Sequence, residues 1–437
     1  MYKWALRIAV GFLALVFIIG VFGYGIAVQR FKLPPYSQLT ELEAAVKSVE
    51  RTVTGEKPWY EQSNALDRTQ MVEDLRPEPR QPALNLITSA IAGRQLSVRV
   101  VDMAGDTLHE WLIDWFDLMP DDSYLREEDR PKNHPGGLVH GTLLMPDGGI
   151  VFNFEEKALI RLDREGNVIW RQPHLTHHSL EFGPDGYLWA PLKRQHLVEE
   201  DARFPDLKPE YDEAIIARID PQDGSIVEQI SIYEILLENE LQSLLYMSRG
   251  NPNNRPTGDI VHLNDVEIFF GSDEPGVFQP GDIMVSMRDV SAVVIFDPVT
   301  RKVRHHWVGL GFIYQHDPDF IDSNRISIFD NNPVGGYTGK QQSRIVIADA
   351  RGGVPEVWYA GTDTGSNPFF TGIMGKHQWL ENGHLVVTST AEGRGFELDA
   401  GGNIVWEYYN LIGDGQTGAV YQVDRLPEWA ARLFAAH

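Results

Sequence analysis

One short pattern recurs along this chain and limits the folds that it can adopt. Each copy has an aspartate, a turn that usually contains glycine, and then valine or isoleucine followed by tryptophan, most clearly at 163–170 and 399–406. Four looser copies begin at Asp102, Asp220, Asp297 and Asp349. Aspartate and glycine favour tight turns between antiparallel strands, so each copy predicts a β-hairpin. The copies recur at intervals of about 50 to 77 residues, which indicates an all-β repeat fold.

A second pattern places a histidine at the start of a strand. After His140, His178 and His316, an apolar residue follows four positions later, and a turn comes soon after it. This order of strand and turn residues predicts a hairpin that begins at the histidine. Core histidines that arose independently would not be expected at the same position of three hairpins.

Together the two patterns make a unit of four short strands. The histidine-led hairpin supplies the inner two strands, and the aspartate-led hairpin supplies the outer two. Complete units begin at His140, His178, His262, His316 and His377. A sixth unit has only its outer half, at 95–114, and the strand-forming residues 419–423 are expected to complete it. Joining the two ends in one sheet closes a ring, which predicts a six-bladed β-propeller over residues 95–437. Helices are expected at 233–249 and 427–436.

The N-terminal part of the chain differs from this body. From Ile8 to Val28 it has 21 residues without a charge, a length that can span a bilayer. We therefore expect an uncleaved transmembrane signal-anchor within residues 1–30, with the propeller on the periplasmic side of the inner membrane. A cleaved signal peptide is the alternative, because Gly25-Ile26-Ala27 has the small residues of a cleavage site. Residues 31–94 are then a stalk, with helical spacing over Leu39–Val53 and a proline-rich linker after it.

Composition excludes some classes of function. The chain has 38 Lys and Arg against 62 Asp and Glu, a formal net charge of -24, so nucleic acid is not an expected partner. It has no cysteine, which excludes disulfides, thiol nucleophiles and thiolate metal ligands. An anionic substrate would need a local basic pocket against this acidic background.

The propeller interpretation decides where the histidines point. The innermost strands of a propeller line a central channel, so residues at the mouth of each first strand approach one axis. Four histidines from consecutive units are expected to meet there, namely His140, His178, His262 and His316. Arg288 is expected to add a fixed positive charge at the same place. The alternative is that the histidines cap turns and that Arg288 pairs with its neighbour Asp289. The remaining irregularly placed histidines are interpreted as surface or structural residues: His174, His177, His305 and His306.

Several segments resemble the bacterial arylsulfate sulfotransferase family: His262-Leu263-Asn264, Ser286-Met287-Arg288, Gln315-His316, Ile328–Asn331 and Gly393–Glu397. The tryptophan-bearing hairpins fit the family as well, and the resemblance covers roughly residues 95–425. It implies a six-bladed propeller that transfers a sulfuryl group from an aryl sulfate ester to a phenol, through a histidine that is itself sulfated. It implies neither a nucleotide sulfate donor nor a metal or other cofactor.

The resemblance also assigns roles to residues. The sulfated nucleophile would be His316, and His262 and Arg288 would be the family's other catalytic histidine and arginine. A further catalytic histidine would be His178, for which the adjacent His177 is an alternative. We ourselves assign two more residues to substrate binding: Asn264 and His140.

These residue types suit the reaction on their own terms. A sulfuryl group in transfer carries negative charge on three oxygens, which hydrogen-bond donors stabilise. Arg288 can donate to two of these oxygens, and His262 can donate to a third or to the leaving phenolate. The nucleophilic imidazole has to be neutral, and a nearby arginine favours this by lowering its pKa. Tyr314 or Phe312 could stack on the aromatic ring of the substrate.

The chain departs from the family in several respects. It cannot form the disulfide of the well-studied members, and it has an anchor and stalk in place of their N-terminal β-domain. The loop 271–281 is inserted, and Ser179 follows His178 where the family usually has aspartate. Two other functions therefore stay open. One is a metal site built from the histidines, although Arg288 would repel a metal ion. The other is a non-catalytic, membrane-anchored interaction platform.

Overall fold

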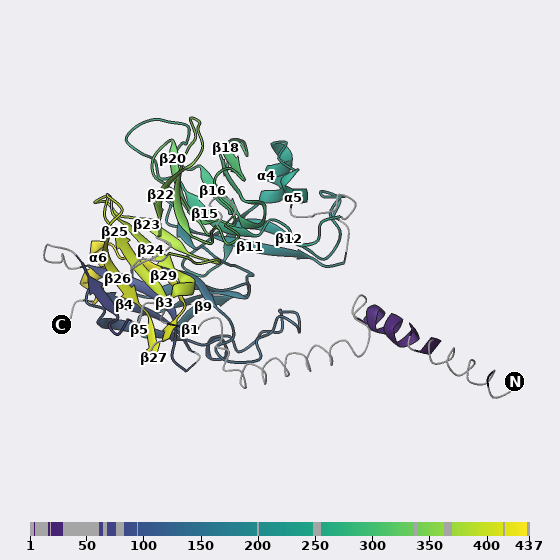
Figure 1. The fold of residues 1–437 in the computed structure, drawn as a ribbon, viewed down its shortest axis with the longest axis horizontal. Helices are drawn as coiled ribbons and strands as arrows, with labels where there is room; N and C mark the ends of the chain where they lie inside the picture. The colour runs from purple at the N-terminus through teal and green to yellow at the C-terminus, as the bar shows by residue number, and fades with distance from the viewer. Residues whose placement is uncertain are drawn as a thin grey trace. The chain divides into compact units, whose positions relative to one another are not determined.

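The computed structural model describes residues 4, 16–17, 19–28, 61–63, 68–75, 83–93, 95–198, 201–247, 255–335, 340–361, 369–413 and 416–434 (Figure 1). The chain divides into two units, residues 1–58 and residues 59–437. In the first unit, the described residues 16–17 and 19–28 are helical. Among the described residues, no helix is both long and apolar enough to cross a membrane. Part of the expected span Ile8–Val28 and all of the expected helix Leu39–Val53 lie outside the described residues.

The described strands of residues 59–437 form the predicted propeller, with six antiparallel blades (Figure 1). Blade 1 pairs, in order, β29 (Val420–Arg425), β3 (Leu84–Ile91), β4 (Gln95–Asp102) and β5 (Thr107–Ile113). Blade 2 pairs β6 (Val139–Leu144), β7 (Ile150–Phe154), β8 (Ala158–Leu162) and β9 (Val168–Gln172). Blade 3 pairs β10 (Glu181–Phe182), β11 (Leu188–His196), β12 (Tyr211–Ile219) and β13 (Ile226–Ser231), with β14 (Gly258–Asp259) parallel to β12.

The remaining blades follow the same order of pairing. Blade 4 contains β15 (Leu263–Ile268), β16 (Ile283–Met287), β17 (Ala292–Phe296) and β18 (Val303–Val308). Blade 5 contains β19 (His316–Phe320), β20 (Arg325–Asp330), β21 (Arg344–Asp349) and β22 (Glu356–Ala360). Blade 6 contains β23 (Lys376–Trp379), β24 (Leu385–Ser389), β25 (Arg394–Leu398) and β26 (Ile404–Tyr409), with β2 (Val72–Asp74) added at its edge. A small separate sheet joins β1 (Glu61–Ser63), β28 (Gln416–Gly418) and β27 (Leu411–Gly413).

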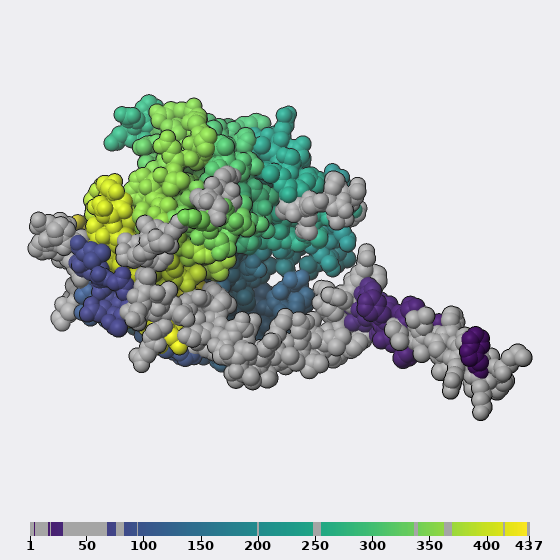
Figure 2. Space-filling model, viewed as in Figure 1, coloured from purple at the N-terminus to yellow at the C-terminus, as the bar shows by residue number. Residues whose placement is uncertain are grey.

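The two ends of the propeller sequence close the ring in blade 1, as predicted. Strand β29 pairs with β3, which pairs with β4, so residues near the chain end share a sheet with 95–102. In Figure 2 the yellow C-terminal and blue N-terminal parts of the body adjoin. One boundary was wrong: residues 84–91 were placed in the linker but form β3. Seven of its eight residues are buried, so it lacks the alternation of a half-buried strand.

The repeated tryptophans connect successive blades. Trp111 of blade 1 donates its Nε1–H to the carbonyl of Asp163 in blade 2 at 3.0 Å. Trp170 of blade 2 donates to Pro221 in blade 3 at 3.1 Å, and Trp406 of blade 6 donates to Met103 in blade 1 at 3.1 Å. A buried indole needs a partner for its N–H, and here the turn of the next blade supplies it. The pattern read from the sequence is therefore a blade-to-blade contact.

Short helices lie outside the blades. Both helical predictions are confirmed, by α4 (Ile232–Glu238) with α5 (Leu244–Met247) in the insertion and by α6 (Glu428–Phe434) near the chain end. A further short helix, α3 (Trp115–Leu118), follows blade 1, and 3-10 turns η1 (Arg288–Val290) and η2 (Thr390–Glu392) follow β16 and β24. The turn η1 places an arginine next to the inner strand of blade 4.

The first-paired strands of the blades line the central channel and bond to one another. Gln422 of β29 accepts from the backbone N–H of Thr142 in β6 at 2.9 Å. Asn264 of β15 donates to the carbonyl of Gln315, just before β19, at 2.7 Å. Arg425 of β29 donates its backbone N–H to Gln378 of β23 at 2.7 Å. The side chains at one end of these strands therefore have fixed positions around a common axis.

Candidate active site

Four histidines meet at one end of the channel: His140, His178, His262 and His316, here called the histidine cluster. His140 lies within β6 and His316 begins β19, while His262 directly precedes β15 and His178 lies three residues before β10. The ring centroid of His178 is 4.4 Å from that of His140, 5.0 Å from that of His262 and 6.0 Å from that of His316. The structure thus brings together the four histidines expected to converge, with His178 at their centre.

Two of these histidines have backbone angles that favour glycine. The φ angles of His178 and His262 are 56° and 51°, in the left-handed region. Non-glycine residues there cost free energy, and they persist where surrounding contacts hold them. The backbone N–H of His178 donates to Glu155 Oε2 at 3.0 Å, and that of His262 donates to Asp259 Oδ1 at 3.0 Å. Each strained histidine is therefore held by a carboxylate.

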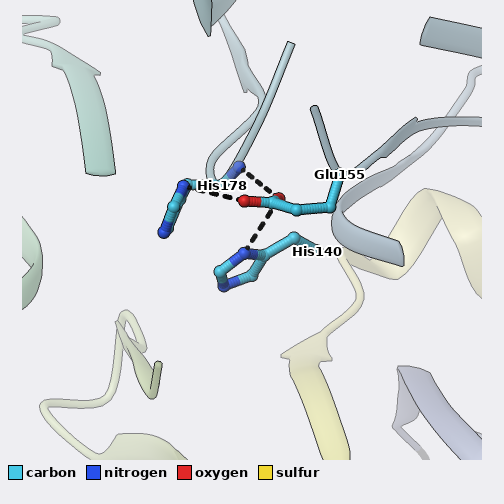
Figure 3. A group of neighbouring side chains, drawn as sticks. All are labelled: His140, Glu155 and His178. Carbon is cyan, nitrogen blue, oxygen red and sulfur yellow. Dashed lines mark hydrogen bonds and ion pairs between the residues drawn. The ribbon is translucent and has the colours of Figure 1, made fainter. Parts of the chain in front are cut away.

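Glu155, which follows β7, joins two members of the cluster (Figure 3). Its Oε2 lies 3.2 Å from His140 Nδ1, and its Oε1 lies 3.2 Å from His178 Nδ1. Burial would raise the pKa of this carboxyl, but His140 and the other surrounding donors lower it to about 2. The carboxylate therefore stays ionised and orients both rings. Sequence reasoning missed Glu155, because one glutamate in a charged turn carries no pattern.

His316 has a defined tautomer. Its Nδ1 lies 2.7 Å from Oδ1 of Asn331, the residue after β20. The Asn331 amide donates to the carbonyls of Thr371 and Met374 at 2.8 and 2.6 Å, so its oxygen must face His316 as an acceptor. Nδ1 therefore carries the proton, and the lone pair is on Nε2. Burial, with further effects from Arg288 and other members of the cluster, lowers the pKa of His316 to about 3 despite the Asn331 bond.

His262 is oriented by Asp259, which sits three residues earlier in β14. Nδ1 of His262 lies 2.8 Å from Asp259 Oδ2. The other ring nitrogen, Nε2, is buried and has no hydrogen-bond partner among the described residues. An aspartate three residues before a candidate histidine was a signal that the sequence did contain.

Arg288 begins η1, and its backbone N–H donates to the carbonyl of His262 at 3.0 Å. Its guanidinium also pairs with Asp289, with Nε and Nη2 at 3.0 and 2.9 Å from Oδ1. The local pair considered as the alternative is thus present. The side chain is 26% exposed, and its charge still contributes to lowering the pKa of His316. A guanidinium held beside the cluster by one half-buried carboxylate is available to an anion.

The other candidate residues lie around this core. Asn264 is buried, and its amide supports the backbone of Gln315 directly before His316, although it was assigned to substrate binding. His177 was interpreted as a surface or structural residue; it is buried, with its Nδ1 2.9 Å from that of His178. Phe312 is fully buried in the core and cannot stack on a substrate, whereas Tyr314 is 37% exposed.

His377, which begins the last complete unit, does not join the cluster. Its Nδ1 lies 3.1 Å from Asp317 Oδ2, and its Nε2 lies 2.7 Å from Ser327 Oγ. It belongs to an acidic group on the inner strands, here called the channel acids: Glu181, Asp265, Glu267, Asp317, Asp319 and Asp424. Burial and mutual repulsion raise the pKa of Glu181 and of Asp265 to about 8, against the attraction of Lys376. Sequence reasoning missed this group.

His140, Glu155 and His178 also have the donor types of a transition-metal site, with ligand atoms all within 4.8 Å of one another. However, the carboxylate oxygens of Glu155 are already engaged by the two imidazoles and a backbone N–H. The positive charge of Arg288 lies beside the same cluster and disfavours a further cation. The hydrogen-bond donors of the cluster, with the guanidinium of Arg288 beside them, suit an anionic group better.

The comparisons with curated proteins and with solved structures assign no function to the chain. No curated protein matches the chain. Among solved structures, it is similar to a protein of unknown function from Bacteroides caccae, at 12% identity and a TM-score of 0.47, over 80% of this chain and 100% of that one. It is also similar to a virginiamycin B lyase from Staphylococcus aureus, at 12% identity and a TM-score of 0.36, over 78% and 89% of the two chains. TM-scores this low add nothing to the assignment.

The family comparison is decisive. Residues 141–411, more than half of the chain, match the model of the family described as arylsulfotransferase (ASST). This range contains three members of the histidine cluster, together with Arg288 and Asn331. The chain belongs to the arylsulfotransferase family.

Proposed function

We propose that this protein is a sulfotransferase that moves a sulfuryl group from an aryl sulfate ester to a phenol, through a sulfated His316. The observation that carries the proposal is the hydrogen bond from His316 Nδ1 to Asn331 Oδ1, at 2.7 Å. It leaves a lone pair on Nε2 of a ring whose pKa is lowered to about 3 by burial, so the ring is neutral at physiological pH. A neutral, oriented imidazole is the form that can attack sulfur.

The reaction divides into two half-reactions. In the first, the Nε2 lone pair of His316 attacks sulfur, an N–S bond forms, and the S–O bond to the aryl group breaks. The departing phenolate takes a proton from Nε2 of a protonated His262 and leaves as phenol. In the second, the acceptor phenol returns a proton to His262 while its oxygen attacks sulfur and the N–S bond breaks. Arg288 donates to the sulfuryl oxygens in both steps, and no metal or other cofactor takes part.

The remaining members of the site have supporting roles. His178 lies between the other three rings and can donate to a sulfuryl oxygen. His140 lies on the side of the cluster that Glu155 contacts. Tyr314 is exposed and is the nearest aromatic residue in sequence to His316, so it is the candidate for stacking on the aryl ring. The substrate pair is then a small aromatic sulfate ester and a phenolic acceptor.

A direct assay tests this function. Purified protein is incubated with 4-nitrophenyl sulfate, with and without phenol, and release of 4-nitrophenol is followed by absorbance. We expect phenol to accelerate release and phenyl sulfate to accumulate in equal amount. Absence of transfer from a range of aryl sulfates to any phenol would contradict the proposal and favour the alternative of a non-catalytic interaction platform.

We further propose that residues 1–30 anchor the protein in the inner membrane, with the propeller in the periplasm. The support is the uncharged stretch Ile8–Val28, with the acidic body on its C-terminal side. Protease treatment of spheroplasts should degrade the propeller, whereas protection of the propeller until the cells are lysed would contradict this orientation.

A further inference from the structure

His262 is the end of a chain of polar contacts that leads away from the histidine cluster. Asp259 Oδ2 lies 2.8 Å from His262 Nδ1, and Nζ of Lys193 on β11 lies 3.0 Å from the same oxygen. Asp259 Oδ1 accepts from the backbone N–H of His262 at 3.0 Å. Lys193 also pairs with Glu156 at 2.6 Å, and its side chain is only 9% exposed. Contacts from Lys193 and from the backbone and ring of His262 thus hold the Asp259 carboxylate against the His262 imidazole.

The charge states of Asp259 and Lys193 follow from their surroundings. Burial alone would raise the pKa of Asp259, but the hydrogen bond from His262 and the charge of Lys193 hold it well below its usual range. Burial would lower the pKa of Lys193, but Asp259 and Glu156 raise it. Asp259 is therefore an anion and an acceptor, so Nδ1 of His262 is always the donor. Any proton that His262 gains or loses during a reaction must pass through Nε2.

Nε2 of His262 is where the chain of contacts ends. It is buried and has no hydrogen-bond partner in the part of the chain that the structure describes. A buried polar atom without a partner is costly, and it marks a position at which a bound molecule completes the bonding. The aromatic oxygen of the substrate is the group that exchanges a proton during sulfuryl transfer. The aromatic oxygen of the substrate is therefore expected beside Nε2 of His262.

We propose that Asp259 and Lys193 are positioning residues that set the acid–base strength of His262 toward the aromatic oxygen. The anion of Asp259 favours the protonated imidazole, which protonates the departing phenolate. The cation of Lys193 opposes this effect, so that the proton can be given up when the phenolate leaves and regained from the acceptor phenol. This inference rests on the proposed sulfuryl transfer, and it adds two residues to that reaction that the resemblance does not assign.

The variants for the test leave the other groups around His262 unchanged. The titratable or charged groups that face it are His177, His178, His316 and the Arg288–Asp289 pair. Asp259→Asn removes the anion and keeps the shape, and Lys193→Met removes the cation and keeps the length. Arg194→Gln is the matched control, because Arg194 lies next to Lys193 on β11 and pairs with Glu213 instead.

The first readout compares two sulfate donors that differ in leaving group. Phenyl sulfate has a poor leaving group that needs protonation, whereas 4-nitrophenyl sulfate has a good one. General acid catalysis contributes ~10²–10⁴-fold, so Asp259→Asn should slow kcat/KM for phenyl sulfate about 10²-fold and for 4-nitrophenyl sulfate less than about tenfold. Arg194→Gln should alter neither. Equal losses with both donors would assign Asp259 a purely structural role and overturn the proposal.

The second readout is the pH dependence of the donor half-reaction. His262 must be protonated to act as the acid, so the rate falls on the alkaline side. Asp259→Asn should move this alkaline limb to lower pH, and Lys193→Met should move it to higher pH. Shifts in the same direction, or none, would overturn the proposal. If Asp259→Asn does not fold, Lys193→Met alone still tests the sign.

An activity-independent measurement separates this inference from the proposed function. NMR titration of 15N-histidine-labelled protein can follow His262 directly, with its signals assigned from His262→Gln. The titration midpoint of His262 should move to lower pH in Asp259→Asn and to higher pH in Lys193→Met. Opposite displacements without any turnover in the wild type would contradict sulfuryl transfer but keep the Lys193–Asp259–His262 arrangement. Normal wild-type turnover without the displacements would contradict the arrangement alone.

Discussion

Asn331 holds His316 in a single tautomer, since its oxygen accepts from Nδ1 at 2.7 Å while its amide group donates to two backbone carbonyls. The amide cannot flip without losing both of those bonds. The orientation of one side chain, fixed by the loop between blades 5 and 6, thus decides which nitrogen of His316 has a free lone pair.

His316 should form a covalent intermediate. Incubated with an aryl sulfate and no acceptor, the wild-type protein should release about one equivalent of phenol in a burst. Mass spectrometry should find an acid-labile sulfuryl adduct on a peptide that contains His316, and the adduct should disappear when a phenol is added. His316→Ala should give neither burst nor adduct, whereas His384→Ala, outside the cluster, should give both. Full transfer by His316→Ala would exclude the covalent mechanism.

Replacing Asn331 should affect the chemistry through the tautomer. Asn331→Leu keeps the size and removes the acceptor, so a fraction of His316 presents N–H at Nε2 and cannot attack. A wrong tautomer in a comparable histidine site lowers the rate by up to ~10⁴-fold. We therefore expect the single-turnover rate constant of Asn331→Leu to be at least ~10²-fold below that of the wild type.

Asn331→Asp keeps an acceptor but adds a negative charge beside His316. The charge favours the imidazolium, so this variant should be active only at higher pH than the wild type, whose nucleophile is neutral above a pKa of about 3. A wild-type rate in Asn331→Leu would show that Asn331 has no such role.

Glu155 should contribute stability that depends on pH. Its pKa is about 2 in the folded protein against a usual 4.5, so its contribution is present above pH 4.5 and is lost as pH falls through 2. The shift corresponds to roughly 3 kcal/mol, and Glu155→Gln should lower the free energy of unfolding by about 2–3 kcal/mol at pH 7. Urea denaturation should show that the free energies of unfolding of the wild type and Glu155→Gln differ less at pH 3 than at pH 7. The exposed control Glu165→Gln should show none at either pH.

Glu181, one of the channel acids, should have the opposite dependence of stability on pH. Burial raises the pKa of Glu181 to about 8, so the neutral form is the one compatible with folding. Its contribution is present below pH 4.5 and is lost as pH rises through 8. Glu181→Gln should therefore stabilise the protein increasingly between pH 5 and pH 9, by at least about 1 kcal/mol, because one pKa unit corresponds to ~1.4 kcal/mol. An exposed Glu228→Gln control should not, and a stability gain independent of pH would contradict the assignment.

The blade architecture could be predicted because its determinants are local. A turn aspartate such as Asp163 and a tryptophan such as Trp170 fall within eight residues of each other, and the same spacing returns in other blades. Strand β3 escaped detection for the opposite reason. Leu84–Ile91 is buried on both faces, so nothing in its sequence alternates, and its position beside β29 depends on residues more than 300 positions away.

The residues of the site also differ in whether local sequence could reveal them. The histidines could be located because each begins a repeated unit, and Arg288 because it directly follows a strand. Their partners could not be found in this way, since Glu155 and Asn331 act through contacts between blades or loops. Asp259 is the exception, because it lies three residues before its histidine. The choice between His177 and His178 also required coordinates, which place His178 among the other rings.

Closure of the ring by β29 has a consequence for the timing of biosynthesis. The histidine cluster comes from blades 2 to 5, which leave the ribosome early, but β3 has no inner partner until residues 420–425 have been made. Until then the first blade presents an unpaired edge, and the circle of inner strands that holds the cluster is open. The ring around the histidine cluster is therefore completed only in the last moments of synthesis, and a chain that ends before Val420 leaves the ring open.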